Sequence, residues 1–97
     1  MAIAIHRDTD SRNCGAKTTV TGQGTVYANE LLVSVNADPN DHGAGNLTAA
    51  CNEVYVNGQL VVIVGNSASE DNLCKPDGGN HCNPKSSSGS GDVFVGG

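Results

Sequence analysis

The sequence predicts a small all-β domain in which three like β-hairpins, joined by long loops, are arranged about a pseudo-threefold axis. Residues 26–38 (VYANELLVSVNAD) and 54–66 (VYVNGQLVVIVGN) are two copies of one unit, and residues 93–97 (VFVGG) begin a third. No 11-residue window has a clean 3.6-residue apolar period, and Gly and Asn interrupt the chain throughout, so no helix of any length is expected. We expect the whole chain, 1–97, to form a single domain.

The two complete copies each predict a β-hairpin. Val, Tyr, Asn, Leu and Val coincide at positions 1, 2, 4, 7 and 8 of both segments, without a gap. A turn is expected at Asn29-Glu30 in the first copy and at Asn57-Gly58 in the second. Asn-Gly is the strongest two-residue hairpin signal, because both residues tolerate positive φ.

The third hairpin is divided between the two ends of the chain. Residues 93–97 supply a first strand and the beginning of a turn, and there the sequence stops. Residues 3–10 (IAIHRDTD) resemble a second strand followed by an acidic turn. We therefore expect the C-terminal and N-terminal segments to pair, since the termini of compact domains often lie close together.

Composition limits both the core and the partners. One Phe, two Tyr, no Trp and 13 Gly leave a thin core, which needs a metal, disulfides or a partner surface for stability. A net charge of −5 with only five Lys and Arg argues against a nucleic-acid partner, and none is expected. Arg7 and Asp8 follow the apolar residues 1–5 too soon for an export segment, so synthesis in a cytoplasm is expected. Four Cys in such a chain favour metal over disulfides.

Three possible metal ligands share one position in the repeats. Each lies 13 residues before the aromatic residue of a hairpin: Cys14 before Tyr27, His42 before Tyr55 and His81 before Phe94. Hairpins related by a threefold axis would bring these three side chains together around it. Cys and His are the side chains that suit zinc best, and iron is also possible with them.

A closed tetrahedral site needs a fourth ligand. We predict Cys74, in the longest loop. Cys82 is the alternative, and it is less favoured because it adjoins His81 and adjacent residues seldom bind one ion without a strained turn. Cys51 has the setting of a small packed hydrophobic residue, and His6 falls outside the shared phase and is expected on the surface or a sheet edge. Two disulfides among the four Cys remain an alternative to the metal site.

The segments "GQGTVYANELLVSVNAD", "NEVYVNGQLVVIVGN" and "GDVFVGG" resemble the repeat of PAAR proteins. The resemblance runs from Ile3 to Gly97 and is greatest to the tail-spike tip proteins of T4-like phages. The Pro-Ala-Ala-Arg motif is replaced by residues 32–35 (LVSV) and 60–63 (LVVI).

This resemblance implies a cone that carries a metal near its apex. Its broad base would cap the end of a trimeric β-helical spike, and the apex would lead as a contractile sheath drives the spike through a target-cell envelope. The resemblance therefore implies a structural protein at the baseplate spike tip of a phage tail, or at the spike tip of a type VI secretion system.

The base is expected to carry the three equivalent aromatic residues Tyr27, Tyr55 and Phe94, either against the spike or within the core. Open strand edges of the hairpins would suit β-augmentation by the spike. No catalytic motif, phosphate loop or small-molecule site is recognisable, and we expect no enzyme activity. A small binding module stabilised by metal or disulfides is the alternative, and a metallohydrolase would require an open position on the metal.

Overall fold

Six short strands form three separate antiparallel pairs in this computed structural model, which describes residues 2–50 and 53–95. The strands are β1 (Ile3–Ala4), β2 (Tyr27–Ala28), β3 (Leu31–Leu32), β4 (Tyr55–Val56), β5 (Gln59–Leu60) and β6 (Phe94–Val95). The pairs are β2 with β3, β4 with β5, and β1 with β6. The prediction of short antiparallel hairpins is confirmed.

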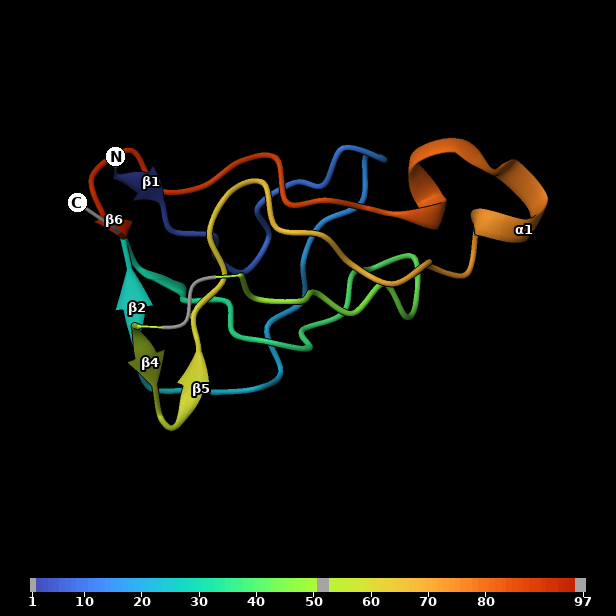
Figure 1. Cartoon of the computed structure of the whole chain (residues 1–97). Coiled ribbons are helices and arrows are strands. Elements are labelled where there is room, and N and C mark those ends of the chain that lie inside the picture. The colour runs from blue at the N-terminus through green and yellow to red at the C-terminus, as the bar shows by residue number, and fades with distance from the viewer. Residues whose placement is uncertain (1, 51–52, 96–97) are drawn as a thin grey trace.

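The three pairs use the same register. Tyr27 lies opposite Leu32, Tyr55 opposite Leu60, and Phe94 opposite Ala4. The second-strand residues of these pairs are therefore spaced 28 apart along the chain. In the third pair, the two strands come from opposite ends of the described chain, which lie together in Figure 1.

The hairpin turns follow from residues that accept the left-handed backbone region. Asn29 and Glu30 have φ of 54° and 68°, and Asn57 and Gly58 have φ of 52° and 82°. Two successive positive φ values define a type I′ turn, whose twist matches that of the flanking strands. Asn and Gly reach this region at low cost, whereas Glu30 does so with a steric penalty.

A ring of three backbone hydrogen bonds connects the hairpin units. The N–H of His6 donates to the carbonyl of Val62, that of Val62 to Ser34, and that of Ser34 back to His6, each at 2.9 Å. All three residues have an exposed fraction of 0%. The three hairpin units are therefore linked in a closed cycle. His6 is part of that cycle and is fully buried, so the expectation that His6 is a surface or edge residue was wrong.

Each second strand is followed, after two intervening residues, by the same kind of side-chain-capped turn. The carboxylates of Asp10 and Asp38 accept the N–H groups of Arg7 and Val35, three residues earlier in each case. Asn66 accepts the N–H of Ile63 in the same way. The preceding residue has positive φ in all three turns: Thr9, Ala37 and Gly65.

The apolar core is small, as the composition suggests. It consists of Ile5, Ala28, Val33, Val61 and Val95, with Val56 and Ile63 packed against it. Much of the remaining interior is polar, and it includes Arg12, of which 2% is exposed. Burial lowers the pKa of Arg12 to about 10, so this guanidinium stays cationic at neutral pH.

Two helices of four residues each depart from the expectation of no helix. They are α1 (Cys74–Asp77) and the 3₁₀ helix η1 (Gly79–Cys82). Figure 1 shows α1 at one end of the molecule and the labelled strands at the other. No helix in the described ranges is long and apolar enough to cross a membrane.

Candidate metal centre

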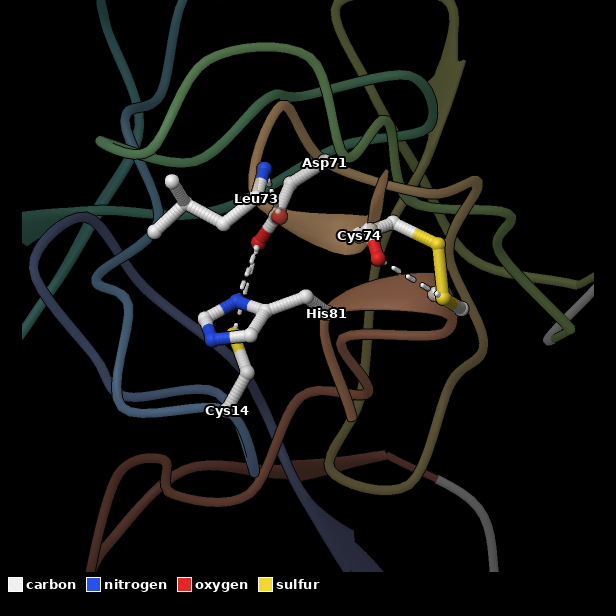
Figure 2. The surroundings of a disulfide bond; sticks show 6 residues. Cys14, Asp71, Leu73, Cys74 and His81 are labelled. Atoms are coloured by element: carbon white, nitrogen blue, oxygen red, sulfur yellow. Dashed lines mark hydrogen bonds and ion pairs between the residues drawn. A yellow bond between two sulfur atoms is a disulfide. The ribbon is translucent and has the colours of Figure 1, made fainter. Parts of the chain in front are cut away.

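Four side chains from three loops converge beside the segment that contains α1 and η1. They are Cys14, His42, Asp71 and His81, and their possible ligand atoms all lie within 4.8 Å of one another. Figure 2 shows the Asp71 carboxylate directed toward the His81 ring and the Cys14 sulfur. The three residues that share a phase in the sequence therefore do come together, and this cluster could hold a metal ion.

The distances around Asp71 resemble the edges of a tetrahedron. Its Oδ2 lies 3.3 Å from Nδ1 of His42, 3.3 Å from Nδ1 of His81 and 3.6 Å from Sγ of Cys14. Bond lengths to tetrahedral zinc imply edges of about 3.3 Å between nitrogen and oxygen, and about 3.6 Å between sulfur and oxygen. The three distances from the carboxylate oxygen thus match those of a tetrahedral site, and the other donor atoms lie within 4.8 Å of one another.

Asp71 is held as a buried anion. Its side chain is fully buried, its Oδ1 accepts the N–H of Leu73 at 2.9 Å, and its Oδ2 accepts Nδ2 of Asn40 at 3.2 Å. Burial alone would raise the pKa of Asp71, but the hydrogen bonds from Leu73, His81, Asn40 and His42 hold it at about 2. A charged ligand is therefore available over the whole physiological pH range.

The thiol of Cys14 has the opposite preference. Burial raises its pKa, and the bond to the anionic Asp71 adds to this effect. A divalent cation would reverse this preference, because metal ligation requires the thiolate. One thiolate and one carboxylate would then neutralise the two charges of the ion, with two neutral imidazoles completing the set.

Local sequence sets the direction of two of these ligands. Cys14 and His42 are each followed by a glycine, and Gly15 and Gly43 have φ of 90° and 92°. A Cβ at Gly43 would lie 2.1 Å from the side-chain nitrogen of Asn72. The backbone conformation favours glycine at this position, and the absence of a Cβ leaves room for the Asn72 side chain, which adjoins Asp71.

The structure does not bring Cys74 or Cys82 to the cluster. These two residues form a disulfide with their Cα atoms 4.6 Å apart, because α1 and η1 fold back on each other (Figure 2). The assignment of the fourth position to Cys74, with Cys82 as alternative, was therefore wrong, as was the preference for metal over a disulfide at these two residues. Among the described residues, Cys14 is the free cysteine, while Cys51 lies outside them.

The spacing of the repeats contained a signal for Asp71. His42 follows Cys14 by 28 residues, whereas His81 follows His42 by 39. The third unit thus contains 11 extra residues. Counting 28 residues forward from His42 reaches Glu70, beside Asp71. The inserted segment therefore begins next to Asp71 and ends at His81, and both of these residues belong to the cluster.

The three aromatic residues are not part of the core of the isolated chain. Tyr27, Tyr55 and Phe94 have exposed fractions of 58%, 60% and 52%. The residue before each of them is also exposed, at 37–38%: Val26, Val54 and Val93. Because the three pairs share one register, the same apolar dipeptide is presented by each hairpin.

Comparison with known proteins adds no relative. No family model matches this chain, and no curated protein matches it.

Proposed function

We propose that this protein is a structural tip that caps the trimeric β-helical spike of a contractile injection machine, in a phage tail or a type VI secretion system. The observation that carries this proposal is the threefold repetition of an exposed apolar dipeptide, at residues 26–27, 54–55 and 93–94. The PAAR-like sequence of the same segments is consistent with it. In this proposal the protein pierces a target envelope and catalyses no reaction.

Symmetry is the first support for a trimeric partner. A single chain can meet three identical subunits equally only if it presents the same residues three times about an axis. The ring of hydrogen bonds through His6, Ser34 and Val62 provides such a relation between the hairpin units.

Exposed apolar area is the second support. The exposed large hydrophobic residues of the described chain are Ile3 and the three Val-aromatic pairs. All belong to the hairpin units, and exposed apolar residues that gather on one part of a soluble protein mark interaction sites. Aromatic residues are also enriched among those that dominate binding energy. The short two-stranded pairs in addition leave strand edges that a spike strand could extend.

The opposite end of the molecule suits an apex. The principal extents are 37 × 27 × 22 Å, and α1 and the disulfide lie away from the labelled strands (Figure 1). In the proposed cone, Cys14, His42, Asp71 and His81 would hold a zinc ion that fastens the three loops below the tip. Such an ion supplies folding free energy, which compensates for the thin core.

The test is association with the trimeric β-helical spike encoded in the same genome. Size-exclusion chromatography with light scattering should give one chain per spike trimer. A triple variant, Tyr27→Ser/Tyr55→Ser/Phe94→Ser, should bind at least about 100-fold more weakly, because exposed aromatic residues at an interface contribute most of its affinity. Lys75→Glu, on α1 at the other end, is the control and should bind normally.

Two results would overturn the proposal. One is a parent protein that shows no association with the spike. The other is a triple variant that associates as tightly as the parent while remaining folded. Either result, together with retained metal binding, would favour a small metal- and disulfide-stabilised binding module instead.

A further inference from the structure

Arg12 is a buried cation without a carboxylate partner among the described residues. Its exposed fraction is 2%, and none of the ion pairs in that part of the chain involves it. Its guanidinium instead donates to neutral acceptors: Oγ1 of Thr18 at 2.6 Å and the carbonyls of Gly45, Pro84 and Asp38 at 2.8, 3.0 and 3.2 Å. A buried charge satisfied in this way is uncommon, because removal from water is costly unless every donor is paired.

The acceptors have a regular relation to the candidate metal ligands. Gly45 follows His42 by three residues, and Pro84 follows His81 by three. One nitrogen, Nη1, donates to both of these carbonyls. Arg12 itself precedes Cys14 by two residues, so a single guanidinium joins the three loops that carry Cys14, His42 and His81.

The number and directions of the guanidinium N–H donors explain why this position holds arginine and not lysine. Nε, Nη1 and Nη2 all donate, in different directions, to Thr18, to two ligand loops and to Asp38. A guanidinium presents five donors in fixed planar geometry, whereas an ammonium is a point charge with three rotatable donors. Lysine would keep the charge at this position but could not connect all these acceptors at once.

We propose that Arg12 is a positioning residue for the metal centre: it holds the three ligand loops at ligand spacing before an ion binds. This inference rests on the metal-binding part of the proposed function and is independent of the spike. Outer-shell hydrogen bonds that orient ligands typically account for 10- to 100-fold in metal affinity. Arg12 differs from the usual outer-shell residue because it bonds the backbone of the loops and not the ligand side chains.

The experiment compares Arg12→Met and Arg12→Lys with the parent and with Lys17→Met, an exposed control in the same loop. Zinc affinity is measured by competition with a chromophoric chelator, at a temperature at which circular dichroism shows each protein folded. Cobalt(II) is then substituted, and its visible absorption reports the ligand geometry. Arg12→Met should bind zinc 10- to 100-fold more weakly with altered cobalt bands, and Arg12→Lys should lie between it and the parent.

The outcomes separate this inference from the proposed function. Unchanged affinity and unchanged cobalt bands in Arg12→Lys would overturn the positioning role, even if Arg12→Met failed to fold. Loss of thermal stability in Arg12→Lys with parental zinc affinity and spectrum would assign Arg12 to the core alone, and would also overturn it. A parent that binds neither ion would remove the metal centre and this inference together, whereas failure of spike binding would affect only the proposed function.

Discussion

At the scale of single residues, His6 shows how a fully buried polar side chain is accommodated. Its Nδ1–H donates to the carbonyl of Ser88 at 2.7 Å, and its Nε2 lies 2.6 Å from Oγ1 of Thr18. Because the same Thr18 oxygen accepts Nε–H of Arg12, its own hydrogen is free to donate to Nε2. These contacts suit a neutral imidazole protonated at Nδ1, which is the form that burial favours by lowering the pKa of His6.

Stability is therefore expected to fall in mild acid. Burial lowers the pKa of His6 below 6.5, its ordinary value, so near and below pH 6.5 the unfolded chain binds a proton that the folded chain does not. The free energy of unfolding is thus highest above about pH 6.5 and decreases as the pH falls toward the folded-state pKa, by at most about 1.4 kcal/mol per pH unit for one group. Urea unfolding at pH 7.5 and 5.5 measures this difference.

His6→Gln is the comparison for that experiment. Glutamine does not titrate, so the variant should lose the part of the pH dependence that comes from His6, whatever its absolute stability. Ligand protonation acts on both proteins, so the difference between their slopes isolates His6. Identical slopes in the two proteins would refute the assignment.

A second residue-scale prediction concerns the fourth ligand. Asp71→Asn removes a charged donor from the cluster, and zinc affinity should fall by at least about 100-fold, because ligand charge offsets that of the ion. The double variant Cys74→Ser/Cys82→Ser should change affinity much less, since neither sulfur points into the cluster. Chelator competition measures both variants. The opposite order would return the fourth position to a cysteine.

At the scale of elements, the two complete hairpins differ in one turn residue. Glu30 has φ of 68° where its counterpart Gly58 has 82°, and no hydrogen bond or ion pair of the described structure uses the Glu30 side chain. Glu30→Gly should therefore stabilise the protein by about 0.5–1 kcal/mol, because a non-glycine residue in this region carries a steric penalty of about 1 kcal/mol.

The reverse substitution is the matched control for that prediction. Gly58→Glu places the same strain in the second hairpin, where a Cβ would meet no other atom within 4 Å, so the backbone penalty alone is tested. It should destabilise by a similar amount. Urea or thermal unfolding measures both, and equal destabilisation by the two changes would contradict the argument.

The hairpins were the most predictable elements because their signals are local. Repeat spacing and turn residues predicted the turns at Asn29 and Asn57, and the split third unit agrees with the pairing of β1 and β6. The segment containing α1 and η1 was not predictable in this way. Its Cys-Lys-Pro-Asp sequence has no helical period, and the pairing of Cys74 with Cys82 across the segment carries no local signal.

At the scale of the whole molecule, the contacts between the hairpin units could not be predicted from the sequence, because their signals are not local. His6, Ser34 and Val62 are spaced 28 residues apart, yet they differ so much in polarity that they do not align as one position. Their equivalence depends on backbone hydrogen bonds across the axis, which do not constrain side-chain type. The role of Asp71 could not be predicted for a similar reason, because its place in the cluster depends on the point at which the 11 extra residues of the third unit are inserted.

The cyclic connection of the units predicts that they unfold together. Each ring bond joins two different hairpin units, so none can open without breaking the ring. In native-state hydrogen exchange, the amides of His6, Ser34 and Val62 should share one free energy of opening, equal to that of global unfolding. With free zinc at 100 times its dissociation constant, a chelator should lower all three values by the same amount, about 2.7 kcal/mol, because the ion binds only the folded chain. Values that differ among the three amides by more than about 1 kcal/mol would mean that the hairpins open separately, and a chelator effect confined to the loops around Asp71 would mean that the ion stabilises only the tip.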